Sequence, residues 1–260
     1  MRSIHHRAML TIMTAAILAS SGPLSPRAHA ADVTVLTVGA YKPVLLDLAA
    51  GYQKQSNDTV SASNDTAGGV GARIGRGEEA DLVILPAASL TALAAQGKIV
   101  AGSIVPLARS GIGVVVKKGA PVPNIGSVDA FKATMLAIPS FAYIDPASGG
   151  SSGVYLASLF QRLGIAEAIR RKAVLVPGGL AASRVDNGEA ALALQQISEL
   201  RLVRGVDYVG PLPAEIQNYT NYAAAIPTSS RRPAAGRALL AWLLSPAGIQ
   251  ALEVRGLEKP

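Results

Sequence analysis

Short apolar runs alternate with longer amphipathic stretches along most of this chain. The first apolar run, residues 33–38, is rich in β-branched side chains and ends at Gly39, as a buried strand does. Residues 43–55 follow, with apolar positions at helical spacing and Pro43 where a first helical turn tolerates it. The pattern therefore predicts a strand followed by a helix, and the same alternation continues downstream.

The same reasoning places the remaining elements. Further strands are predicted at residues 60–63, 80–85, 112–116, 137–144, 174–176, 190–195, 208–210 and 222–226. Further helices are predicted at residues 68–75, 87–96, 128–136, 152–163, 166–172, 180–187, 231–244 and 246–255. This alternation predicts an α/β protein with mainly parallel sheets, in which ligands bind at the carboxyl ends of strands.

The first 30 residues have the pattern of a secretory signal peptide. Basic residues at the start precede an uncharged apolar segment, residues 8–20, and Ala28-His29-Ala30 supplies the small residues of a cleavage site. The apolar segment is shorter than the roughly 20 residues of a membrane-spanning helix, and no later stretch is long enough either. We therefore predict cleavage after Ala30 and export to the periplasm.

The composition of residues 31–260 excludes several kinds of chemistry. The chain has no cysteine, and its three histidines (His5, His6 and His29) all lie in the predicted signal peptide. Thiol and imidazole nucleophiles, disulfides and the usual zinc sites are thereby excluded. No pair of carboxylates has a spacing that indicates acid–base catalysis, although carboxylate, lysine or tyrosine chemistry stays open in principle. We predict no metal, no cofactor and no enzymatic activity.

The charge of the same segment favours small anionic ligands over nucleic acid. Residues 31–260 carry 21 basic and 17 acidic side chains, a net charge of +4. This excess is mild and is not clustered as in a nucleic-acid-binding surface. A soluble protein that meets anions fits this balance.

Three loops of small and polar residues precede predicted helices, at residues 37–42, 64–69 and 145–153. The first backbone N–H groups of a helix have no partner within the helix, and the helix dipole favours a negative charge beside them. Serine or threonine hydroxyls in these loops, as at Thr66, Ser151 and Ser152, could add neutral donors. Each loop taken alone could equally be a helix cap or a turn.

At these positions the sequence resembles the type II periplasmic solute-binding proteins, in particular the molybdate-binding branch. The resemblance covers nearly all of 31–260, and its matching stretches are residues 33–36, 72–84, 145–164, 187–190 and 243–247. It implies a signal peptide at 1–30 and two α/β domains, residues 31–110 plus 211–260 and residues 111–210, with a ligand cleft between them. It also implies hinge closure over the ligand, a monomer, and ABC permease subunits as membrane partners.

The sequence departs from that branch at several expected ligand contacts. Ala40 and Ala67 stand where the branch usually has serines, Gln196 aligns roughly with its tyrosine, and Ser152 is retained. Unmade hydrogen bonds to a desolvated oxyanion cost about 1–3 kcal/mol each, which favours an organic carboxylate over molybdate or tungstate. The alternatives are such an inorganic oxyanion, a sensory binding protein, or an enzyme on the same fold. The candidate ligand-binding residues are Ala40, Tyr41, Thr66, Ala67, Gly68, Arg109, Ser151, Ser152, Gly178 and Gln196.

Overall fold

The computed structural model describes residues 32–260, so the predicted signal peptide and its cleavage site lie outside the described residues. Two five-stranded sheets form the frame, in the orders β2-β1-β3-β10-β4 and β7-β6-β8-β5-β9. The strands of the first sheet are β1 (Asp32–Val38), β2 (Thr59–Asp65), β3 (Leu82–Pro86), β4 (Val105–Ser110) and β10 (Thr220–Ala225). Those of the second are β5 (Ile112–Lys117), β6 (Phe141–Ile144), β7 (Ala173–Val176), β8 (Leu192–Gln196) and β9 (Val206–Pro211).

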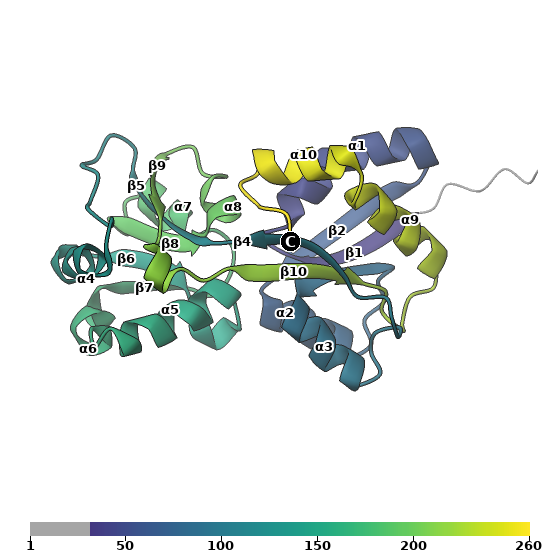
Figure 1. The fold of residues 1–260 in the computed structure, drawn as a ribbon, viewed down its shortest axis with the longest axis horizontal. Helices are drawn as coiled ribbons and strands as arrows, with labels where there is room; N and C mark the ends of the chain where they lie inside the picture. Colours follow the sequence, from purple (N-terminus) through teal and green to yellow (C-terminus); the bar gives the residue numbers. More distant parts are fainter. Residues whose placement is uncertain (1–31) are drawn as a thin grey trace, which may run out of the picture.

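We call the part of the chain built on the first sheet the first lobe, and the part built on the second sheet the second lobe (Figure 1). The first lobe contains α1 (Lys42–Ser56), α2 (Ala67–Gly75), α3 (Ala87–Ala95), α9 (Pro233–Leu243) and α10 (Pro246–Val254). The second contains α4 (Val128–Ala137), α5 (Ser151–Arg162), α6 (Ala166–Ile169), α7 (Ala182–Asp186) and α8 (Ile197–Leu200). Short 3-10 turns lie at η1 (Pro146–Ser148), η2 (Arg170–Lys172) and η3 (Ala214–Ile216).

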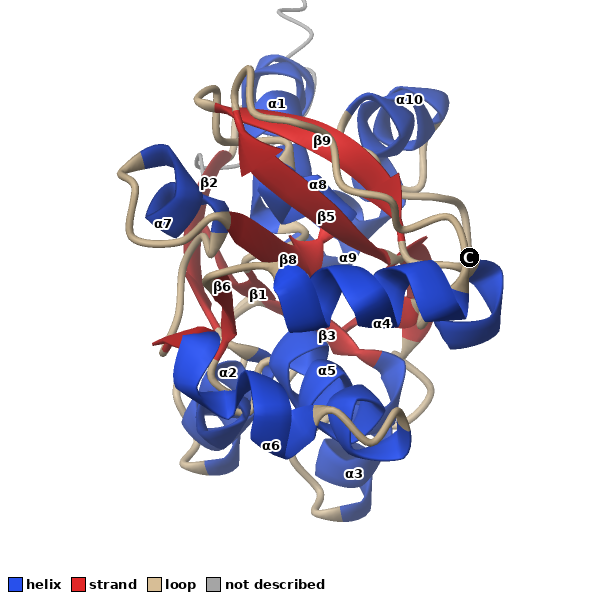
Figure 2. Cartoon of the chain, turned by 90° about the vertical axis from the view of Figure 1, so that its left-hand side faces the viewer, coloured by secondary structure: helices blue, strands red, loops and turns tan. Residues whose placement is uncertain are grey.

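Helices cover both faces of each sheet. In the first lobe α1, α9 and α10 lie on one side of the strands, and α2 and α3 lie on the other (Figure 1). In the second lobe one apolar core joins the sheet to α4, α5 and α6, whereas a separate core joins its other face to α7 and α8 (Figure 2). Strands buried on both faces explain the nearly continuous apolar runs of the sequence.

The chain crosses between the lobes twice, from β4 to β5 and from β9 to β10. Gln217, in the second crossing, accepts a hydrogen bond from the backbone N–H of Ile112 at 2.8 Å and donates to its carbonyl at 2.9 Å. The two crossings are thus bound side by side.

The predicted fold class is confirmed, but two elements were absent from the sequence prediction and one statement was wrong. Strand β4 and helix α8 were not expected, and they are six and four residues long. The sheets are not mainly parallel, because each combines two parallel with two antiparallel pairings. Both antiparallel pairings of the first sheet involve β10, which returns from the second lobe, and one of them is with the missed strand β4.

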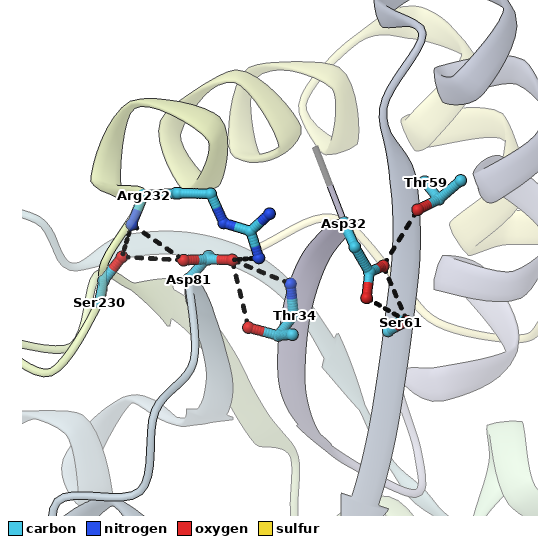
Figure 3. Close-up of polar contacts among 7 residues, drawn as sticks. All are labelled: Asp32, Thr34, Thr59, Ser61, Asp81, Ser230 and Arg232. Atoms are coloured by element: carbon cyan, nitrogen blue, oxygen red, sulfur yellow. Dashed lines mark hydrogen bonds and ion pairs between the residues drawn. The ribbon is translucent and has the colours of Figure 1, made fainter. Parts of the chain in front are cut away.

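A buried carboxylate fixes the amino-terminal part of the first lobe (Figure 3). Asp81, which is 2% exposed, accepts hydrogen bonds from the backbone N–H and the hydroxyl of Thr34 at 3.0 and 3.2 Å. Its other oxygen accepts from the hydroxyl of Ser230 and the backbone N–H of Arg232, whereas the Arg232 guanidinium lies 3.3 Å from the oxygen that Thr34 contacts. Asp81 therefore ties β1 to the start of α9, and its role is structural.

Within residues 32–260, no helix combines the length and the apolar character that crossing a membrane requires.

Candidate functional site

A cavity of about 470 Å³ lies between the lobes, which is within the usual range for small-molecule sites. The first lobe lines it with residues that follow β1 and β2, together with Tyr222 of β10 and Arg255 after α10. The second lobe lines it with the start of α5, the loop at residues 178–180 and the segment from the end of β8 into α8. Three helices, α1, α2 and α5, thus begin at its wall.

The start of α5 offers free donors to this cavity. Ser151 and Ser152 line it, and Ser152 is 3% exposed. The first helical hydrogen bond here is donated by Val154 to the carbonyl of Gly150, so the N–H groups of residues 151–153 precede the helical ladder. Two hydroxyls and the end of a helix dipole therefore provide a place for a carboxylate or another anion.

The start of α2 is used differently, because its donors bind the other lobe. The Thr66 hydroxyl donates to the carbonyl of Ser148 at 2.6 Å and accepts from the N–H of Gly69 at 3.0 Å. The N–H of Gly68 donates to the carbonyl of Gly149 at 3.1 Å. The bonds to Ser148 and Gly149 join the lobes directly beside the cavity, and we call them the inter-lobe latch. The sequence had suggested that these donors face a ligand.

Two cations of the first lobe line the cavity. Lys42, at the start of α1, donates to the side-chain oxygen of Asn64 at 2.8 Å and makes no ion pair within residues 32–260. Arg255 forms a two-point ion pair with Asp47, with both bonds at 2.6 Å. Lys42 is therefore the cation of the wall that has no anionic partner in the described chain, whereas Arg255 is already neutralised.

Two glutamines of β8 organise the floor of the cavity. Gln195 accepts from the N–H of Ala181 at 2.7 Å and donates to the carbonyl of Gly179 at 2.8 Å, which fixes the loop at residues 178–180. In the amide orientation that gives both side-chain atoms a hydrogen-bond partner, the Gln196 nitrogen donates to the carbonyls of Ser110 and Gly111. The Gln196 oxygen then accepts from the Thr220 hydroxyl. Gln196 thus lines the cavity and also binds both chain crossings.

Glu199 is a cavity residue that the sequence analysis did not single out. It lies in α8, which begins where the N–H of Ile197 donates to the carbonyl of Gly111 at 3.0 Å. Desolvation by burial raises the pKa of Glu199 to about 8, although the neighbouring Gln195 amide acts in the opposite direction. The carboxyl makes no ion pair within residues 32–260, so no paired cation holds its pKa down.

Most of the predicted ligand-binding residues lie at this cavity. Those that line it are Ala40, Thr66, Ala67, Ser151, Ser152, Gly178 and Gln196. Tyr41 is fully buried in the core of the first lobe, and its hydroxyl has no hydrogen-bond partner within residues 32–260. Gly68 belongs to the latch and lies outside the wall of this cavity. Arg109 is also outside, because it pairs with Glu258 at 2.7 Å and stacks on the ring of Tyr219.

The described part of the chain contains no typical cluster of metal-binding side chains. No group of three or more histidine, cysteine, aspartate or glutamate residues is gathered there.

A family comparison decides which proteins this chain is related to. Residues 33–258 match the family model described as bacterial extracellular solute-binding protein. The chain belongs to this family. The predicted resemblance to periplasmic solute-binding proteins is thereby confirmed, and the family supports an extracytoplasmic location. The cleavage site after Ala30 is not tested by this match.

Solved structures show the same fold. The periplasmic molybdate-binding protein of Azotobacter vinelandii superposes with a TM-score of 0.74, at 19% identity over 88% of this chain and 100% of that one. The sulfate-binding protein of Mycobacterium tuberculosis gives a TM-score of 0.71, at 18% identity over 89% of this chain and 87% of that one. At these identities the likeness establishes the two-lobed architecture alone.

One relative corrects the prediction that the protein does no chemistry. An aconitate isomerase from a Pseudomonas species is 36% identical to this solute-binding protein, over 95% of both chains. The prediction rested on the absence of histidine, cysteine and a recognisable carboxylate pair. It was wrong because catalysis does not require those residues: other side chains, including a single carboxyl, can transfer protons without any such motif.

Proposed function

We propose that this solute-binding protein binds an unsaturated tricarboxylate of the aconitate type between its lobes and interconverts its cis and trans isomers. The observation that carries the proposal is a cavity that combines anion donors with one proton-exchanging carboxyl. The 36% identity to an aconitate isomerase over nearly the whole chain supports the same substrate class.

The cavity wall offers several groups to a polyanion. The start of α5, with Ser151 and Ser152, suits one carboxylate, and Lys42 suits a second. Arg255, neutralised by Asp47, lies at the same wall and adds donors without a full charge. Apolar side chains also line the cavity and fit a short carbon skeleton; they belong to Pro43, Leu46 and Leu180.

The reaction needs only the movement of one proton. Aconitate has a methylene group next to a carbon–carbon double bond, and carboxylates flank both. Removal of a methylene proton leaves an electron pair that spreads over three carbons, and return of a proton to the far carbon shifts the double bond. The geometry of the new double bond is set by the conformation in which the skeleton is held, and no oxidant or reductant takes part.

The family match also supports a second role, delivery of the bound anion to an ABC permease. Both roles would use the same cavity, because proteins of this architecture close their lobes over a ligand. The permease partner and the monomeric state remain predictions from the resemblance.

Proton NMR with the purified protein tests the isomerase proposal. We expect cis-aconitate and trans-aconitate, supplied separately, to converge on one mixture at a rate proportional to the protein concentration. Thermal-shift measurements with both isomers, citrate, molybdate and sulfate would report binding independently, since a ligand at 100 times its Kd stabilises by about 2.7 kcal/mol. Stabilisation by molybdate or sulfate with no interconversion of aconitate would refute the proposal.

A further inference from the structure

We propose that Glu199 is the catalytic residue that removes and returns the proton, and that it is brought into its working position by the opposite lobe at Gly39. This inference rests on the proposed isomerase function and names the group that performs it. Its support comes from the titratable groups of the cavity wall and from the packing of Glu199 against the first lobe.

Five titratable side chains line the cavity: Lys42, Asp65, Glu199, Tyr222 and Arg255. An arginine keeps its proton in proteins, and Arg255 is in addition paired with Asp47. Burial raises the pKa of Tyr222 far above neutrality, so its hydroxyl remains a neutral donor. The candidates for the catalytic base are therefore Asp65, Glu199 and Lys42.

Two of these three are engaged in other contacts. Asp65 is exposed, and its carboxylate accepts the N–H of Thr66 at 2.7 Å at the start of α2. Lys42 is held by Asn64 and is the unpaired cation that a polyanionic substrate would meet. Within residues 32–260 Glu199 has neither an ion pair nor a capping role; it neighbours the Gln195 amide and faces the same space.

The position of Glu199 depends on contact between the lobes. A methyl group placed on Gly39 would lie 2.5 Å from Oε1 of Glu199, so the carboxyl is packed directly on the backbone of the first lobe. This contact covers one side of the carboxyl and so contributes to the desolvation that raises its pKa. Separation of the lobes would expose the carboxyl and return it to ordinary acidity.

The chemical step then balances without another reagent. Glu199 as carboxylate takes a proton from the substrate methylene, the C–H bond breaks, and the electron pair spreads over the three-carbon unit. Glu199 as carboxylic acid returns the proton to the far carbon, and the double bond forms between the first two carbons. The side chain ends in the state in which it began.

Glu199→Gln tests the inference, since it keeps the size of the side chain and removes its basicity. We expect kcat to fall by at least about 100-fold, the lower range for loss of a general base, with KM changed by less than a factor of about three. Exchange of the substrate methylene protons in D2O, followed by NMR, should be lost in parallel. Thermal shifts with trans-aconitate should persist in the variant. Glu215→Gln, at an exposed carboxyl of η3 away from the cavity, is the matched control.

Two results would overturn the assignment: a Glu199→Gln variant with kcat within tenfold of the wild type, or one that still exchanges the substrate methylene protons in D2O at the wild-type rate. If Glu199→Gln fails to fold, Glu199→Asp serves instead, and an unchanged rate there would count against the inference. A wild-type protein that neither interconverts aconitate nor exchanges its protons would refute the proposed function itself, which separates the two failures.

Discussion

The carboxyl of Glu199 in the second lobe lies against the backbone of Gly39 in the first, with space for no methyl group between them. This contact places a titratable group of one lobe on the surface of the other. It therefore links the separation of the lobes to the acidity of a cavity carboxyl.

Gly39→Ala should displace Glu199 and leave the fold intact. The added methyl would lie 2.5 Å from Oε1, which is the end of a flexible side chain and therefore moves first. Misplacement of a reacting group by about 1 Å costs roughly 100-fold in rate, so we expect kcat to fall by between about 10- and 100-fold. Steady-state kinetics and the melting temperature would be measured together. Gly71→Ala, where nothing lies within 4 Å, is the control and should behave as the wild type.

The pH dependence of stability should report the half-buried carboxyl of Glu199. Folding raises the pKa of Glu199 from 4.5 to about 8, so the folded state favours the neutral form. Its contribution to stability is full below about pH 4.5 and is lost as the pH rises through about 8. Glu199→Gln should therefore melt at the same temperature as the wild type near pH 4, and several degrees higher near pH 8. Parallel melting curves of the two proteins across this range would contradict the assigned burial.

The activity should show the opposite trend with pH. A general base works only when it has lost its proton, so kcat/KM should rise as the pH approaches and passes about 8. Initial rates between pH 5 and pH 9 measure this. In Gly39→Ala the midpoint should move toward lower pH, because the carboxyl gains water. An identical midpoint in both proteins would show that Gly39 does not control the acidity of Glu199.

The inter-lobe latch should control how far the lobes close. Gly149 has a φ of +72°, and a methyl group there would lie 2.9 Å from the Cα of Gly68. Gly149→Ala should hold the lobes apart, raise the radius of gyration measured by X-ray scattering with ligand, and weaken aconitate binding by about tenfold or more. Gly164→Ala has a similar φ of +68° with nothing within 4 Å, so it separates backbone strain from lobe contact. Equal binding by the two variants would exclude a role for the latch.

Lys42→Met should weaken binding with little effect on the chemical step. The ammonium group has no anionic partner within the described residues, and charge-assisted hydrogen bonds contribute about 1.5–3 kcal/mol. We expect KM for aconitate to rise by about 10- to 100-fold, and its dependence on salt concentration to become weaker. Lys54→Met, at an exposed position in the last turn of the same helix, should have neither effect. A wild-type KM in Lys42→Met would show that the carboxylates bind elsewhere.

Several features of this protein follow from the sequence alone, because they depend on composition or on neighbours along the chain. Periodicity in stretches such as residues 33–38 and 43–55 predicts strand and helix, and Ser151 and Ser152 mark the start of α5, which faces the cavity. The absence of cysteine and histidine from residues 31–260 removes whole classes of catalysis, however the chain folds. Family membership can also be recognised from the sequence alone, as the match over residues 33–258 confirms.

Tertiary structure alone decided the rest, because the decisive contacts join residues far apart in the sequence. Helix α8 has only four residues, too few for a periodic pattern, so Glu199 carried no local signal. Its raised pKa arises from burial between two lobes, and Gly39 lies 160 positions earlier in the numbering. Likewise Thr66 and Gly68 resemble ligand-binding donors in the sequence, yet in the folded chain they bind Ser148 and Gly149. Composition and periodicity specify which groups are present, whereas burial and long-range packing determine which of them can react.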